Sequence, residues 1–219
     1  VLRDGGLTTP TDSAFSAGMI SAKLGGLTAN ARVRICPVLP INEDFEKMKP
    51  DAPPPGWSGV MGKTAIVDRD GSKCFKKLST KAKPSPTFKM RAFAGPPLPI
   101  GYTVEVDIHG TLARKRFKPD MGLINCRYEL IVLGQARELE LARWRDEPTH
   151  ALRKRIPYDM KFDAWYRFKL RVEKWTIELD DPCPNNEGSP GLFAISNGTT
   201  DKSDGAEVFY DNLKVYANE

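Results

Sequence analysis

The chain of 219 residues carries 33 lysines and arginines against 28 aspartates and glutamates, which gives a formal net charge of +5. No run of residues approaches the roughly 18 apolar residues that a membrane-spanning segment needs. The 18 glycines and 18 prolines favour a turn-rich, all-β fold over a helical one. The positive charge weakly favours acidic partners, but a merely basic surface is the simpler explanation, and we do not expect nucleic acid to be the partner.

The cysteines and histidines do not have the spacing of a metal site. There is no C-x-x-C pair, and His109 and His150 lie far apart in the chain, so we expect no metal and no cofactor. Cys36 and Cys183 each precede a proline, a setting that allows a surface disulfide in an oxidising compartment. Buried free thiols are the alternative for all four cysteines, and the sequence leaves this choice open.

Residues 1–36 are predicted to form a β-hairpin. Two strand-like stretches, Met19–Leu24 and Ala31–Ile35, flank Gly25-Gly26, a pair that favours a tight turn. A two-stranded hairpin is marginally stable alone, so we expect it to pack on the rest of the chain, on a partner or on a further N-terminal domain. Residues 37–57 follow as a proline-rich connector that includes the first strand of the next unit.

Residues 58–219 contain runs in which apolar and polar residues alternate, the pattern of strands that bury one face and expose the other. The Asp70-Gly71 dipeptide between two of these runs is a strong hairpin signal. Trp165, Tyr166 and Phe168 lie in the most regular run and are predicted to be core residues. We predict two stacked antiparallel sheets, with strands at residues 63–67, 73–78, 87–94, 102–108, 121–133, 165–172, 192–196 and 207–215.

One junction does not fit this pattern. Arg171–Glu173 runs into Lys174–Leu179 without a turn residue, and a single strand of about twelve residues is longer than usual. Either the strand is unusually long, or a segment is missing between Glu173 and Lys174. A missing segment would leave a sheet edge that a partner should cover.

Several runs come in the same order as the strand motifs of a known family, namely Gly101–Val106, Asp120–Asn125, Arg127–Leu130, Trp165–Val172, Gly188–Leu192 and Phe209–Val215. They resemble the C-terminal module of bacterial PQQ-binding-like β-propeller repeat proteins, which is similar to the concanavalin A-like jelly roll of the 3-keto-disaccharide hydrolase domain. The resemblance covers residues 37–219, and residues 1–36 resemble the end of an immunoglobulin-like repeat. It implies an all-β, antiparallel jelly-roll β-sandwich with an N-terminal β-hairpin extension. Because the propeller is absent, it implies no PQQ-type cofactor.

A candidate ligand-binding face lies in the middle of the predicted sandwich. Period two places Asn125, Arg127 and Glu129 on one face of a single strand, and Trp144 is expected on the next strand. Such polar and aromatic side chains suit the hydroxyl groups and rings of a glycan, although a solvated sheet face explains the same pattern. Asp211 and Asn212, near the end of the last strand, are predicted to be turn or ladder-end residues rather than ligand-binding residues.

No catalytic constellation is evident, since there is no G-x-S-x-G elbow, Walker loop or cysteine–histidine pair of credible spacing. We therefore predict a non-catalytic accessory module that binds carbohydrate or another protein chain in the periplasm or outside the cell. The resemblance keeps a glycoside-cleaving enzyme of the keto-disaccharide hydrolase type as an alternative. Such an enzyme needs two carboxylates roughly 5–10 Å apart, and Glu129 with Glu138 or Glu140 is a conceivable pair, but the sequence gives no pairing register that would assign it. A structural subunit of a larger assembly, with contacts through residues 1–36, is the third alternative.

Overall fold

The computed structural model describes residues 2–3, 6–9, 12–78, 89–99, 101–125, 128–143, 153–173, 188–198 and 205–219. The regular structure in these residues is β, and the paired strands are antiparallel. The strands are β1 (Leu2–Arg3), β2 (Gly6–Leu7), β3 (Ser16–Leu24), β4 (Leu27–Ile35), β5 (Ile41–Glu43), β6 (Thr64–Arg69), β7 (Ser72–Lys77), β8 (Lys89–Phe93), β9 (Tyr102–Gly110), β10 (Asp120–Ile124), β11 (Tyr128–Leu133), β12 (Glu138–Arg143), β13 (Arg153–Pro157), β14 (Trp165–Val172), β15 (Gly191–Ile195) and β16 (Val208–Ala217).

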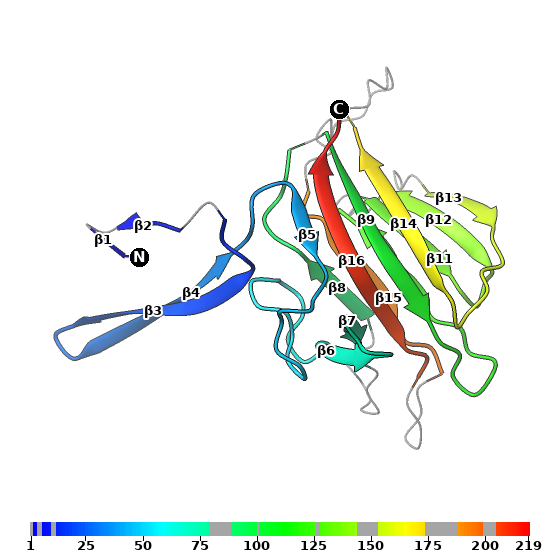
Figure 1. The fold of residues 1–219 in the computed structure, drawn as a ribbon, viewed down its shortest axis with the longest axis horizontal. Coiled ribbons are helices and arrows are strands. Elements are labelled where there is room, and N and C mark those ends of the chain that lie inside the picture. The colour runs from blue at the N-terminus through cyan, green and yellow to red at the C-terminus, as the bar shows by residue number, and fades with distance from the viewer. Residues whose placement is uncertain are drawn as a thin grey trace.

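Most strands belong to two stacked sheets of an antiparallel jelly-roll β-sandwich, which confirms the predicted fold class (Figure 1). The sheet that we call the β10 sheet has the order β13–β12–β11–β10–β15–β8. The β9 sheet has the order β14–β9–β16–β7–β6, and β5 pairs with the second half of β16. The hairpin β3–β4 extends from one end of the sandwich, as predicted. The division into residues 1–36, 37–57 and 58–219 stays a prediction.

The core lies between the two sheets, where the alternating strands bury their apolar residues. Val104, Val106 and Ile108 of β9 are fully buried in the same cluster as the inward residues of β10 and β15. Two buried phenols bridge distant strands. The Tyr210 hydroxyl donates to the Phe193 carbonyl of the β10 sheet, and the Tyr102 hydroxyl donates to the Gly188 carbonyl at 2.9 Å. These bonds satisfy polar groups that would otherwise be costly to bury.

The connector is fixed to the sandwich by aromatic packing. Trp57 is 1% exposed, and its ring centroid lies 5.4 Å from that of Phe75 on β7 and 6.1 Å from that of Phe45. The ring centroid of Phe15, just before the hairpin, also lies 5.7 Å from that of Trp57. The base of the hairpin is therefore held against the sandwich by one aromatic cluster.

The run 121–133, predicted as one strand, contains two strands that pair with each other. β10 ends at Ile124 and β11 begins at Tyr128, and the antiparallel register places Ile124 opposite Glu129. Asn125 forms the turn, since its Oδ1 accepts the Tyr128 N–H at 2.7 Å and its own N–H donates to the Tyr128 carbonyl at 3.0 Å. The apolar–polar alternation continues through the turn, which is why the sequence pattern did not reveal it.

Trp165 is not a core residue, contrary to the prediction. Along β14 the buried residues are Phe168 and Val172, and Tyr166 in the same register is half-buried against the core. Trp165 is in the opposite register, on the solvent side, and is 42% exposed. Because Trp165 is large and apolar, the sequence suggested burial, although its register on β14 places it on the solvent side.

Asp211 and Asn212 are not at the end of the last strand. They lie at a bulge inside β16, where the register with β9 shifts between Asp211 and Lys214 and Asn212 has a φ of 52°. Asparagine tolerates this left-handed conformation better than most residues. Cys36 is a free thiol. Cys183 and the junction at Lys174 lie outside the described residues.

Within the described part of the chain, no helix is long and apolar enough to cross a membrane.

Candidate functional site

The outer face of the β10 sheet carries charged side chains around an apolar centre. In β8, Met90 and Ala92 point into the core, so Lys89, Arg91 and Phe93 lie on the outer face. The registers of the six strands place further charged residues on the same face, namely Glu129 of β11, Glu138 and Glu140 of β12, and Arg153 and Arg155 of β13. Ile124, Ile131 and Phe193 form a separate small apolar cluster between them.

Two glycines lie where the backbone of a neighbouring strand leaves no room for a side chain. A Cβ on Gly122 would lie 2.0 Å from the Leu130 carbonyl oxygen, and a Cβ on Gly191 would lie 2.4 Å from the Ala92 carbonyl oxygen. Neither position can hold any other residue without a backbone shift. The middle of the face therefore has no side chain at these two positions, and the long charged residues around them can reach across it.

An ion pair spans this centre. Arg91 and Glu129 stand on β8 and β11, which are separated by β15 and β10, so their backbones are three strand spacings, or about 14 Å, apart along the sheet. The Arg91 Nε donates to Glu129 Oε1 at 2.9 Å, and the Arg91 Nη2 donates to the same oxygen. Both side chains must extend over the sheet to meet, and we call this pair the strap.

The strap helps to cover the small apolar cluster. The Arg91 guanidinium carbon lies 5.8 Å from the centre of the Phe193 ring, and the Lys89 ammonium lies 4.9 Å from it. Phe193 is accordingly only 3% exposed although it points away from the main core. Burial, followed by the charge of Arg91, lowers the pKa of Lys89. The result is a surface where cations are held over an aromatic ring.

A second set of ion pairs lies beside the strap. Glu140, whose side chain is 7% exposed, accepts from Arg155 Nε at 2.6 Å and faces Arg153 Nε at 3.3 Å. Arg155 also reaches Glu138 at 3.3 Å. These contacts join β12 to β13, an edge strand whose residues are exposed. The guanidinium and carboxylate groups of this face thus pair with one another across β12 and β13.

Of the four predicted site residues, two are described. Glu129 lies on the outer face and forms the strap, while Asn125 is fully buried and forms the β10–β11 turn. Arg127 and Trp144 lie outside the described residues. Arg91 and Phe193 were not predicted as neighbours of Glu129, whereas Glu140 was considered only as a possible acidic partner without a known register. Their alternation within each strand is visible in the sequence, but their proximity depends on the strand order, which the pattern does not contain.

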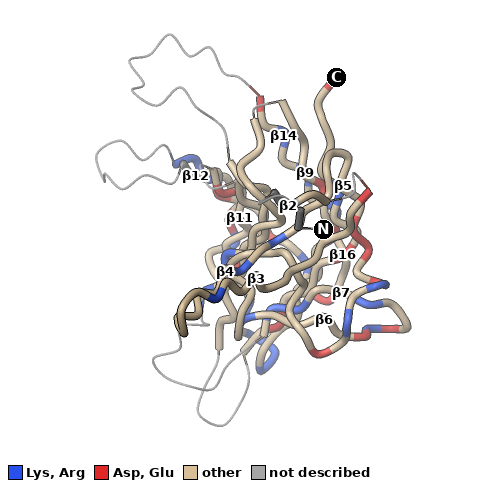
Figure 2. Tube along the Cα trace, turned by 90° about the vertical axis from the view of Figure 1, so that its left-hand side faces the viewer, with Lys and Arg blue, Asp and Glu red and all other residues tan. Residues whose placement is uncertain are grey.

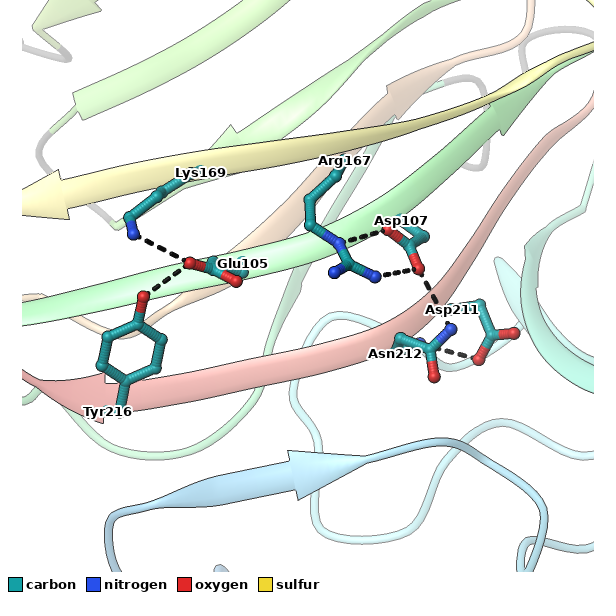
Figure 3. A network of polar contacts seen from close by, with 7 residues as sticks. All are labelled: Glu105, Asp107, Arg167, Lys169, Asp211, Asn212 and Tyr216. Carbon is teal, nitrogen blue, oxygen red and sulfur yellow. Dashed lines mark hydrogen bonds and ion pairs between the residues drawn. The ribbon is translucent and has the colours of Figure 1, made fainter.

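The outer face of the β9 sheet also carries a polar network (Figure 3). Arg167 donates to both carboxylate oxygens of Asp107 at 2.8 and 2.9 Å, and Asn212 Nδ2 donates to Asp107 at 3.0 Å. These side chains come from directly adjacent strands, β14, β9 and β16. This network covers no separate apolar cluster among the described residues, which distinguishes it from the strap.

No group of three or more histidine, cysteine, aspartate or glutamate side chains among the described residues is arranged to hold a metal ion.

No protein-family model matches the sequence, and a search among curated proteins finds no match. A solved structure from work on endo-acting O-glycanases, with which members of the human gut microbiota initiate mucin breakdown, is similar with a TM-score of 0.54 and 12% identity. The match covers 82% of this chain and 99% of that chain.

Two further structures are more distant. A family 30 carbohydrate-binding module matches with a TM-score of 0.38 and 12% identity over 80% of this chain and 91% of that chain. SGBP-B from a complex xyloglucan utilization locus in Bacteroides uniformis matches with a TM-score of 0.35 and 10% identity over 92% of this chain and 56% of that chain. These two matches are too weak to support an inference about the fold or function of this chain. At 12% identity the first match shows the fold alone, and the chain therefore has the β-sandwich fold of that structure.

Proposed function

We propose that the protein is a non-catalytic carbohydrate-binding module whose ligand lies on the outer face of the β10 sheet. The observation that carries the proposal is the strap, in which Arg91 and Glu129 are held over Phe193 in the middle of an open sheet face. A guanidinium donates several hydrogen bonds in a fixed plane and a carboxylate accepts several, so together they match the neighbouring hydroxyls of a sugar.

The ion pairs reduce the cost of binding. Because the strap and the Glu140–Arg155 pair already fix their side chains, little rotamer freedom is lost when a ligand bonds to them. We include Arg127 and Trp144 in the proposed site as further ligand-binding residues. In the sequence, Arg127 directly precedes β11 and Trp144 directly follows β12. The adjoining residues Tyr128 and Arg143 are paired in the sheet.

The similar structure supports the proposal only by analogy of fold. It comes from work on O-glycanases, so proteins that act on glycans use this kind of sandwich, but a fold hosts many functions. The proposal also includes a location in the periplasm or outside the cell, where a glycan ligand would be met. It further includes the module's membership in the PQQ-binding-like β-propeller protein family, which the order of strand motifs suggests.

A glycan array followed by calorimetry on the best ligand tests the proposal. We expect the unmodified chain to bind, and Arg91→Ala to weaken binding at least about tenfold, which is about 1.4 kcal/mol. Arg167→Ala is the matched control, because Arg167 makes a comparable arginine–carboxylate pair on the opposite sheet. It should leave the affinity unchanged.

The double variant Arg127→Ala with Trp144→Ala tests the two remaining ligand-binding residues of the proposed site in the same assay. Loss of affinity in this variant would support their place in the site. Unchanged binding in both this double variant and Arg91→Ala would place the ligand elsewhere and overturn the proposed site.

The second candidate function is glycoside cleavage, and it is favoured by the positions of two acids. Glu129 pairs with Ala142, so Glu140 is its diagonal neighbour on the same face. Diagonal residues lie about 7–8 Å apart, with their Cβ atoms somewhat closer, within the range of carboxylate pairs in glycosidases, roughly 5–10 Å. Turnover of a keto-glycoside that is lost in both Glu129→Gln and Glu140→Gln would support this candidate. Binding without turnover would support the non-catalytic one.

A further inference from the structure

Lys89 is a cation without a carboxylate partner on the outer face of the β10 sheet. Its ammonium lies 4.9 Å from the centre of the Phe193 ring, and among the residues that the structure describes no acidic side chain lies within ion-pair distance of it. Its cross-strand partner on β15 is Ile195, and Phe193 is its diagonal neighbour on the same strand. The cross-strand neighbours of Lys89 are therefore apolar.

The arginines in the described strands of this face, by contrast, have acidic partners. Arg91 bonds to Glu129 in the strap, and Arg153 and Arg155 both contact Glu140 at the other side of the face. Figure 2 shows acidic and basic residues together along β12. Within these strands the unpaired positive charge therefore lies at Lys89.

One further carboxyl group, that of Asp120, lies in the same row of the sheet as Lys89. The register pairs both residues with Ile195, from opposite sides, so their backbones are two strand spacings, or about 9.5 Å, apart. The Asp120 Oδ1 accepts the Gly134 N–H at 3.0 Å. Asp120 thus bonds to the turn between β11 and β12 rather than to Lys89.

The position of Lys89 favours an anion supplied by a ligand. Burial, and after it the charge of Arg91, disfavours the charged ammonium and lowers the pKa of Lys89. A bound anion would offset both effects, because it supplies an opposite charge and accepts hydrogen bonds from the ammonium. A charge-assisted hydrogen bond of this kind is roughly twice as strong as a neutral one.

We propose that the ligand of this face is an acidic glycan, whose carboxylate or sulfate group binds Lys89 while its hydroxyls bind the strap. This inference rests on the proposed function and names the class of glycan. Lys89 and Arg91 both lie over the Phe193 ring, so neighbouring groups of one glycan can contact both. Carboxylate and sulfate share the chemistry that Lys89 recognises, namely negatively charged oxygen acceptors.

A glycan array that holds each acidic glycan beside its neutral counterpart tests this proposal. One series contains uronic acid oligosaccharides and the same chains with the carboxyl groups reduced to hydroxyls. The other contains sulfated oligosaccharides and the same chains after desulfation. We expect the acidic member of a pair to bind at least about tenfold more tightly than the neutral one. The series in which this preference appears identifies the acidic group.

Lys89→Met tests whether Lys89 is the source of the preference. Methionine keeps a long apolar side chain over Phe193 but has no charge, so the acidic and neutral members should bind with about equal affinity. Lys89→Arg keeps the charge and should keep the preference. Lys169→Met is the matched control, because Lys169 lies on β14 of the opposite sheet and pairs with Glu105 at 3.0 Å. It should bind both members like the unmodified chain.

Equal affinity of the unmodified chain for acidic and neutral members would overturn the inference and leave the proposed function standing. So would a preference that survives in Lys89→Met. A chain that binds no glycan on the array would overturn the inference and the proposed function together. If Lys89→Met fails to fold, salt dependence decides. Raising the ionic strength should weaken binding of the acidic member more than binding of the neutral one, and an equal effect on the two would contradict the inference.

Discussion

Tyr210 and Phe193 connect the two sheets of the sandwich. The Tyr210 hydroxyl of β16 crosses the core and donates to the backbone carbonyl of Phe193 on β15, while the Phe193 side chain points to the opposite side, under Arg91. One residue thus joins the interior of the molecule to the proposed ligand face. Burial raises the pKa of Tyr210 far above its ordinary value, which favours the protonated phenol that donates this hydrogen bond.

Tyr210→Phe should therefore destabilise the fold without affecting the ligand face. The change removes the donor and leaves a buried carbonyl without it, which costs about 1–2 kcal/mol of the free energy of unfolding. Urea denaturation measures this loss. A variant as stable as the unmodified chain would show that the inter-sheet bond contributes nothing.

The strap should contribute to stability even if no ligand binds. Arg91→Ala removes a partner of the half-buried Glu129 and uncovers Phe193, and the free energy of unfolding should fall by about 1–2 kcal/mol, between the values of exposed and buried pairs. The more exposed Arg167 covers no such cluster, so Arg167→Ala should lose less. Equal losses in urea denaturation would mean that the strap is an ordinary surface ion pair.

Lys77 should make stability depend on alkaline pH. This lysine is fully buried, its Nζ donates to the Leu78 carbonyl at 2.6 Å, and burial lowers its pKa from 10.5 to about 8. Between these values the unfolded chain binds more protons than the folded one, so this group makes stability rise with pH from about 8 to about 10.5, by up to about 3 kcal/mol. Below pH 8 the full free-energy cost of burying the charged Lys77 reduces the stability of the fold.

Lys77→Met should remove this cost. The variant should be more stable than the unmodified chain at pH 7, and the difference should shrink as pH rises toward 10.5. Comparing the two chains by thermal denaturation at each pH is necessary, because burial also raises the pKa of Cys74 to about 11, which lowers the stability of both chains above pH 9. A difference that stays constant with pH would contradict the role assigned to Lys77.

Gly122 should tolerate no side chain. Gly122→Ala places a Cβ 2.0 Å from the Leu130 carbonyl oxygen, and we expect a loss of about 3 kcal/mol or more. Gly18→Ala is the control and should fold normally, because Gly18 lies on β3 of the N-terminal hairpin and no atom is within 4 Å of the added Cβ. A stable Gly122→Ala variant would show that β10 and β11 can separate without cost.

Local alternation was enough to predict the fold class and most strands. The pairing of β6 with β7 around Asp70-Gly71 and of β3 with β4 around Gly25-Gly26 follows from turn-forming residues that are visible in the sequence. The break between β10 and β11 was missed, because the apolar–polar alternation of residues 125–130 looks like that of a continuous strand. Trp165 was misplaced, because its size suggested burial while its register is that of Arg167.

The candidate site was less predictable than the fold. Glu129 was identified, but its partner Arg91 lies 38 residues earlier, on a strand that becomes its neighbour only through the order of four strands in the sheet. Alternation tells which side of a strand a residue takes, whereas the meeting of side chains across a sheet depends on long-range pairing. The pairing of Glu129 with Glu140 as diagonal neighbours likewise required the register.

Hydrogen–deuterium exchange of the full chain, with and without the best glycan from the array, tests the central claim most directly. We expect ligand-dependent protection in β8, β10, β11 and β15, whose outer faces surround the strap, and none in β9, β14 or β16. Protection confined to the β9 sheet or to the hairpin β3–β4 would contradict the account.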